Sequence, residues 1–213
     1  MPVIVIAPAA PLLDAASLRR LVPGLVGLDD NHLDMLIAVA QQHVEPPDTT
    51  VGRSFGAQTL ELVAADFAEI EARGVIPLPY PPITEVVSVT YRDADEVSHT
   101  IAQADYRSFL DGVFCSLRPA PGRTWPVCLG EPGSVRIRFK AGYAADAREL
   151  MPVKHAVALS VQSLQSLARE DIFLRRKKTD GVSEKEWAVT PQAEKLLRET
   201  IERLLWPYRR VVM

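Results

Sequence analysis

Few of the residues that are capable of chemistry occur at the spacing that a metal ion or a reaction needs. His32 and His43 are 11 residues apart, which on a helix separates them by roughly 16 Å of rise, too far to hold one metal ion. We therefore expect two solvent-facing histidines. The segment Asp93-Ala94-Asp95-Glu96 resembles half of a calcium loop, but Ser98 and Ala104 stand where that loop has Gly and Glu. An acidic hairpin turn is the better interpretation, because Asp side chains bond neighbouring backbone amides.

Motifs that carry catalysis or cofactor binding are missing from the sequence. It has no G-x-S-x-G elbow, P-loop, G-x-G-x-x-G or H-E-x-x-H. We therefore predict no catalytic residue, no cofactor and no metal ion, and a protein that is not an enzyme. The enzyme alternative is an unrecognised carboxylate site with two buried acids in one cleft, which a sequence cannot reveal.

Two segments near the C-terminal end have the composition of contact surfaces. Arg175, Arg176, Lys177 and Lys178 form the strongest basic run, which is either a docking surface for DNA or an acidic protein, or a solvated loop. The second segment combines aromatic and basic side chains that are frequent in interface hot spots. It consists of Trp206, Pro207, Tyr208, Arg209 and Arg210. Its alternative role is an anchor that folds back on its own chain.

The composition is that of a globular protein with one large domain or a domain carrying an insertion. The chain has 213 residues, of which 47% are hydrophobic and 24% charged, with a formal net charge of -3. Residues 169–213 carry a net charge of +3 and the remainder -6, so bulk charge does not favour a nucleic-acid coat. Cys115 and Cys128 are expected as reduced thiols, with a disulfide as the alternative. No signal peptide or apolar span is present, so we expect a protein made in the cytoplasm without membrane contact.

Hydrophobic periodicity divides the chain into helical, strand and again helical regions. Asp14 and then Asp29 or Asp30 are N-cap candidates for two helices, the second with Leu33, Leu36, Ile37, Ala40 and Val44 on one face. The middle region alternates with period two, most clearly where Val135, Ile137 and Phe139 are interleaved with Arg136, Arg138 and Lys140. Helical spacing returns after Pro152 and again after Pro191.

The predicted fold class is α+β, a small helical bundle with an inserted, mostly antiparallel β subdomain. The predicted division is an N-terminal arm over residues 1–13, the first helical part over 14–50, the β subdomain over 51–143, the C-terminal helices over 144–205, and a docking tail over 206–213.

Six motifs in the same order resemble one family of proteins. Residues 75–95, VIPLPYPPITEVVSVTYRDAD, are similar to that family's L-P-x-P-P-[VI]-x-x-V-x-S-V-x-Y-x-D-x-D-G segment. They are followed by DYR at 105–107, WP at 125–126, AGY at 141–143, PVKHAV at 152–157 and LLWPYR at 204–209, and preceded by a similar helix from Asp29 to Val44. The family is that of the head–tail connector (adaptor) proteins of tailed bacteriophages and gene transfer agents. Three departures are Glu96 in place of the turn Gly, a more basic spacer at 175–189, and the extra residues 1–13.

The resemblance implies a structural role in the neck of a phage-like particle. Members form a ring, typically dodecameric, between the portal protein of a DNA-filled capsid and a stopper or tail-completion protein. Double-stranded DNA passes through the channel without specific binding. The alternative function is a DNA-binding regulator that uses the basic residues 175–178, and strongly salt-dependent DNA binding would be its mark.

Two sets of interface residues follow as hypotheses. The portal surface would comprise Arg175, Arg176, Lys177, Lys178, Trp206, Pro207, Tyr208, Arg209 and Arg210. The ring interface would pair Asp93 and Asp95 of one copy with Arg136 and Arg138 of the next, because a ring contact joins two different patches.

Overall fold

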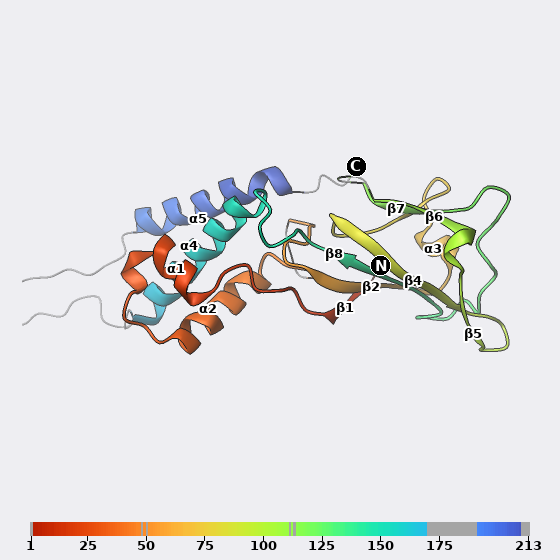
Figure 1. Ribbon diagram of the computed structural model, residues 1–213, viewed down its shortest axis with the longest axis horizontal. Coiled ribbons are helices and arrows are strands. Elements are labelled where there is room, and N and C mark those ends of the chain that lie inside the picture. Colours follow the sequence, from red (N-terminus) through yellow and green to blue (C-terminus); the bar gives the residue numbers. More distant parts are fainter. Residues whose placement is uncertain are drawn as a thin grey trace, which may run out of the picture. The chain divides into compact units, whose positions relative to one another are not determined.

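The computed structural model describes residues 2–47, 49, 51–110, 112, 114–169 and 191–209. Two compact units share the chain. The β unit comprises Met1–Leu12, Gln42–Leu150 and Tyr208–Met213, and the helical unit comprises Leu13–Gln41 and Met151–Pro207. The predicted α+β class is confirmed: the strands form antiparallel sheets in one unit and the longer helices belong to the other (Figure 1).

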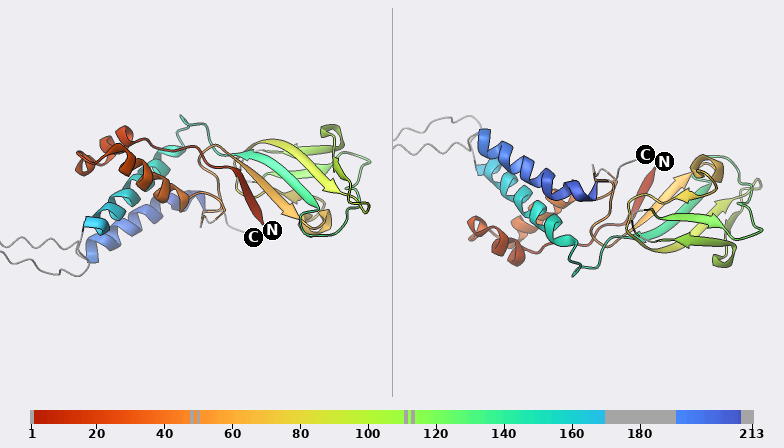
Figure 2. Two further views of the ribbon diagram at one scale, coloured as in Figure 1. Left: turned by 90° about the horizontal axis from the view of Figure 1, so that it is seen from below. Right: turned by 90° about the horizontal axis from the view of Figure 1, so that it is seen from above.

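A five-stranded antiparallel sheet forms the larger part of the β unit, with the strand order β1-β2-β8-β4-β5. Its strands are β1 (Val3–Ala7), β2 (Gln58–Ala64), β4 (Ile83–Arg92), β5 (Ser98–Thr100) and β8 (Val135–Ala141). The central strand β8 alternates buried and solvent-facing residues as its sequence predicts. Strand β1, drawn in red, is one edge of the sheet (Figure 2). The strand order makes β5 the other edge.

A second, three-stranded sheet with the order β3-β7-β6 completes the core of the β unit. Its strands are β3 (Ile76–Pro77), β6 (Tyr106–Phe109) and β7 (Ser116–Pro119), and a short helix α3 (Phe67–Ile70) and a 3-10 turn η2 (Gln103–Asp105) accompany them. The core joins side chains of both sheets: Leu60, Leu62, Ile137 and Phe139 from the larger, and Ile76 and Leu117 from the smaller, are all fully buried. Covering one face of the five-stranded sheet in this way leaves its other face to solvent.

The segment leading into β2 is fixed by a buried carboxylate. Glu45, which is 4% exposed, accepts hydrogen bonds from the backbone N–H groups of Phe55 at 3.0 Å and Gly56 at 2.6 Å. The Gln58 Nε2 donates a third hydrogen bond at 2.8 Å. Three donors compensate the cost of removing this carboxylate from water. Beside it, Gly142 has φ 110°, and a Cβ there would lie 2.2 Å from the Gly56 carbonyl oxygen.

The helical unit contains α1 (Ala15–Leu21), α2 (Asp30–Gln42), α4 (Leu150–Arg169) and α5 (Pro191–Leu205), with the 3-10 turn η1 (Pro23–Leu25) between the first two. Asp14 is the N-cap of α1, and its side chain accepts from the Ser17 N–H. Leu18 and Leu33 are fully buried, as are Val153 and Val161 on α4. On the predicted α2 stripe, Ile37 and Ala40 are buried like Leu33 and Leu36 is half-buried, whereas Val44 lies beyond the end of the helix.

Two local expectations differ from the structure. Residues 3–7 of the expected arm form the edge strand β1, paired to β2. His32 does not face solvent freely, since its Nε2 is hydrogen-bonded to the Gln165 side chain at 2.9 Å.

Candidate functional site

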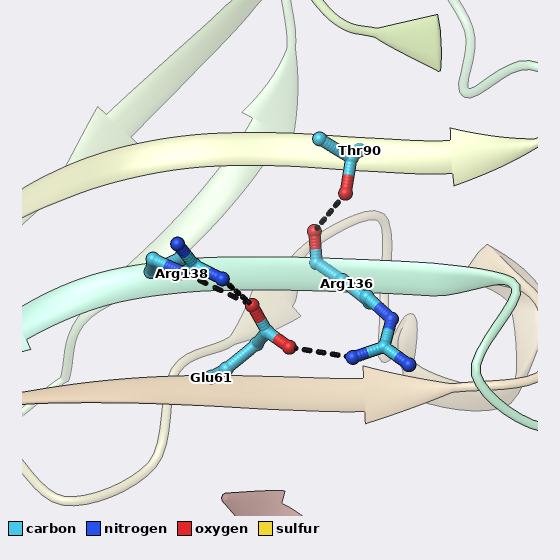
Figure 3. Close-up of polar contacts among 4 residues, drawn as sticks. All are labelled: Glu61, Thr90, Arg136 and Arg138. Atoms are coloured by element: carbon cyan, nitrogen blue, oxygen red, sulfur yellow. Dashed lines mark hydrogen bonds and ion pairs between the residues drawn. The ribbon is translucent and has the colours of Figure 1, made fainter. Parts of the chain in front are cut away.

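A buried glutamate holds two arginines on the solvent face of the five-stranded sheet (Figure 3). Glu61 of β2 is 4% exposed, and its Oε1 accepts from Arg136 Nη1 at 2.8 Å. Its Oε2 accepts from Arg138 Nε at 3.0 Å and Nη2 at 2.8 Å. Charge-assisted bonds of this kind are short and directional, so the glutamate fixes where both guanidinium groups lie.

The strand register explains why these three side chains meet. Glu61 lies opposite Arg138 in the β2–β8 pair, and Arg136 lies opposite Val63, two residues further along β2. Directly opposite residues point to the same face of a sheet, and diagonal neighbours are within reach of long side chains. The side chains of Arg136 and Arg138 remain 50% and 42% exposed. One carboxylate under two guanidinium groups leaves a net positive charge that faces solvent.

The same face continues with smaller polar contacts. Thr90 of β4 donates from Oγ1 to the Arg136 carbonyl oxygen at 3.4 Å. Lys140 pairs with Glu85 at 2.8 Å, and both side chains are more than half exposed. Toward the other edge, Ile4 of β1 lies opposite Glu61 and is 44% exposed. An apolar edge therefore adjoins the arginine pair.

The predicted acidic turn follows β4, and its first carboxylate stabilises the turn itself. Asp93 Oδ1 accepts from the N–H groups of Asp95 at 3.0 Å and Val97 at 2.9 Å, while Oδ2 is hydrogen-bonded to His99 Nε2. The bond from His99, followed by the N–H of Val97, lowers the pKa of Asp93 below its ordinary value of 3.8. Asp93 is thus engaged within its own chain.

The remaining acids of the turn face outward. Asp95 and Glu96 are exposed, and within the described residues their carboxylates make no hydrogen bond or ion pair. Glu96 adopts φ 62°, a left-handed backbone conformation that glycine adopts most easily. Val97 beside it is 51% exposed.

The C-terminal aromatic residues differ in their surroundings. Tyr208 packs edge-on against Phe55 with ring centroids 5.5 Å apart, and its hydroxyl donates to the Glu149 carbonyl oxygen at 2.6 Å. Arg53 Nε donates to the Tyr208 carbonyl oxygen at 2.8 Å. Burial is the main cause that raises the pKa of Tyr208 above its ordinary value of 10.0. The hydroxyl therefore keeps its proton and acts as a hydrogen-bond donor. Trp206, in contrast, is 67% exposed.

The sequence-predicted sets are only partly within the described residues. Arg175, Arg176, Lys177, Lys178 and Arg210 lie outside them. Pro207 and Arg209 are exposed like Trp206, whereas Tyr208 is half-buried. The two halves of the ring-interface hypothesis lie on different parts of the β unit, with the arginines on β8 and the acids in the β4–β5 turn.

Sequence reasoning missed Glu61, although a signal was present. A lone acid between Leu60 and Leu62 on a strand is a natural partner for a strand that carries Arg136 and Arg138, but the pairing of β2 with β8 was needed to see it. Elsewhere in the described residues, no group of three metal-binding side chains occurs. Among these residues, none of the helices combines the length and apolar character that a membrane crossing requires.

The fold and these surfaces define an α+β protein whose prominent exposed features are charged and apolar contact patches. Its structure is similar to solved chains of gene transfer agent particles. One is from the virion of the native particle, with TM-score 0.68 and 18% identity, covering 100% of this chain and 97% of that one. Others are from the neck of the empty particle computed with C6 symmetry (TM-score 0.66, 20% identity) and of the native particle computed with C12 symmetry (0.65, 18%), with the same coverage. No protein-family model matches the sequence, and neither does any curated protein.

Proposed function

We propose that this chain is a structural subunit of the neck of a phage or gene transfer agent, and within the neck the head–tail connector (adaptor). In this role, copies form a ring that joins the portal protein of the DNA-filled capsid to the stopper or tail-completion protein. The subunit is made in the host cytoplasm and then incorporated into the particle.

The observation that carries this proposal is the likeness over the whole length to chains of solved particle necks. A match that covers 100% of this chain and 97% of the other includes both the β unit and the helical unit. Two of the similar structures were computed with sixfold and twelvefold symmetry, which supports assembly as a closed ring. The order of the six sequence motifs supports the narrower role of adaptor.

The surfaces of the described residues support assembly with other proteins. Trp206 is 67% exposed beside the anchored Tyr208, and an exposed Trp on a fixed backbone is a typical interface anchor. We assign Trp206, together with Pro207, Arg209, Arg210 and the basic residues 175–178, to the contact with the portal. Tyr208 itself is anchored within the β unit through Phe55 and Glu149. The ring then surrounds DNA without reading its sequence.

The experiment that tests the function is deletion of the gene in the particle-producing host, followed by electron microscopy of the lysate. We expect DNA-filled or leaking heads beside separate, complete tails, because the joint between them is missing. Complementation with the intact gene should restore tailed particles. Normal tailed particles from the deletion strain would overturn the proposal, and salt-dependent DNA binding by the purified chain would then favour the regulator alternative.

A further inference from the structure

The solvent face of the five-stranded sheet has a built contact surface near its β1 edge. Ile4, Glu61 and Arg138 lie opposite one another on β1, β2 and β8, so they form one row across the sheet. Ile4 and Ile6 are each 44% exposed, and β1 contains no charged residue. We call the surface formed by Ile4, Ile6, Arg136 and Arg138 the β1–β8 face.

Within the described residues, the exposed side chains of this edge strand are apolar rather than charged. Natural sheets protect their edges with charges, prolines or covering segments, because a bare apolar edge recruits other chains. Strand β1 is short and has an irregularity between Val5 and Ala7, which protect an edge in part, but its side chains are all apolar, so its exposed face favours an apolar occupant. The arginines next to it are held in place by Glu61 before any partner arrives, which reduces the entropy lost on binding.

The opposite end of the same unit carries a complementary projection. The β4–β5 tip, defined as Asp95, Glu96 and Val97, combines two acids with an exposed apolar side chain. The backbone N–H groups of Asp95 and Val97 donate to the Asp93 carboxylate, and these bonds fix the backbone of the tip. Acids can meet the guanidinium groups of Arg136 and Arg138 while Val97 packs on the isoleucines. The tip therefore matches the β1–β8 face in both charge and apolar character.

We propose that the β1–β8 face of one copy receives the β4–β5 tip of the neighbouring copy. The occupant is thus a second copy of this chain. The two patches are different, and the sheet order puts β1 and β5 on opposite edges (Figure 1), as a head-to-tail contact that closes into a ring requires. This contact rests on the proposed ring function and assigns its residues. Asp93 is excluded from the contact, and Glu96, Val97, Ile4 and Ile6 are added to it.

Cross-linking in assembled particles tests the contact directly. Particles are made with the Ile4→Cys/Val97→Cys chain, purified, and treated with a short bis-maleimide reagent before denaturing electrophoresis. We expect a ladder of covalent multimers, because each copy joins the next on both sides. Either single variant should give no ladder, and wild-type particles report the background from Cys115 and Cys128. The Ile4→Cys/Val127→Cys chain is the matched control, since Val127 is 90% exposed in the same unit but outside the tip.

The outcomes separate this inference from the function on which it rests. Particles that contain the double-cysteine chain and yield only monomers, or an equal ladder from the Val127 control, would overturn the contact alone. Wild-type particles that lack the chain altogether would overturn both the contact and the proposed function.

Charge reversal at the tip gives a second, independent readout. Asp95→Lys/Glu96→Lys should lower the yield of tailed particles by about tenfold or more, since attraction to the arginines becomes repulsion. The control Glu71→Lys/Asp146→Lys makes the same change in net charge at exposed acids of the same unit and should leave the yield unchanged. Equal melting temperatures of both variants and the wild type would show that folding is intact. A wild-type yield from the tip variant would refute the contact.

Discussion

The Tyr208 hydroxyl donates a hydrogen bond to the carbonyl oxygen of Glu149, 2.6 Å away, and so fixes Tyr208 within the β unit. The Arg53 side chain also donates to the Tyr208 carbonyl oxygen, and the Tyr208 ring packs against Phe55. Tyr208 therefore contributes to the stability of the folded chain. The neighbouring Trp206 is left as the exposed aromatic side chain. Stability and partner binding are therefore expected to depend on different residues of one short segment.

Substitutions in this segment should separate the two effects. Tyr208→Ala should lower the free energy of unfolding by about 2 kcal/mol, because it removes a half-buried ring and its hydrogen bond. Trp206→Ala should change it by less than about 0.5 kcal/mol, yet weaken binding to the portal by about tenfold or more. Urea unfolding and a pull-down with purified portal measure the two quantities. Equal portal binding by Trp206→Ala and the wild type would contradict the assigned surface.

The glutamate beneath the two arginines should matter more than the other ion pairs of that face. Glu61→Ala leaves two guanidinium groups without their shared acceptor and should cost about 2 kcal/mol or more, less than a fully buried pair because the arginines are half exposed. The control Glu85→Ala breaks the exposed pair with Lys140 and should cost less than about 1 kcal/mol. Similar losses from both variants in urea unfolding would show that the burial of Glu61 has no energetic weight.

The acidic turn should contribute stability that depends on pH. The pKa of Asp93 is lowered in the folded chain from 3.8, first by the bond with His99 and then by the N–H of Val97. A lowered folded pKa favours the ionised native state, so this contribution is present above the unfolded pKa and is lost as the pH falls through the folded pKa. Relative to Asp93→Asn, the wild type should be more stable above the unfolded pKa, and the difference should shrink in more acidic solution. Thermal unfolding at several pH values measures it, and a difference independent of pH would contradict this role.

The close approach of two glycines should be the least tolerant backbone position. Gly142→Ala would place a Cβ 2.2 Å from the Gly56 carbonyl oxygen at φ 110°, so we expect a loss of more than about 2 kcal/mol in the free energy of unfolding. Gly24→Ala is the control, because nothing lies within 4 Å of a Cβ there, and it should be nearly neutral. An unaltered melting temperature for Gly142→Ala would show that this turn can rearrange.

Local patterns allowed the four longer helices and the central strand β8 to be predicted from the sequence. The cap at Asp14, the stripe on α2 and the alternation of β8 depend on neighbours within a few residues, and such signals are readable in one chain. The edge strand β1 was not predicted, because its short apolar run becomes a strand only by pairing with residues about 60 positions later.

The candidate site was predictable only in part for the same reason. The cations of β8 were identified as one strand face, but their partner Glu61 depends on which strands are adjacent. The role of Asp93 was also hidden, since its bonds to His99 and Val97 require the geometry of the folded turn. Composition could not separate Tyr208 from Trp206, because both are aromatic residues in one segment, and only the folded chain shows which of them is anchored.

The division of the helical unit between two distant stretches of sequence has a consequence for synthesis on the ribosome. About a hundred residues separate the end of α2 from the start of α4, so at usual elongation rates roughly ten seconds pass before the second pair of helices begins to emerge. Throughout that interval Leu18 and Leu33, which are fully buried in the finished unit, remain uncovered on the nascent chain. Chaperones that bind apolar segments should therefore associate with the emerging polypeptide until α4 and α5 have left the exit tunnel.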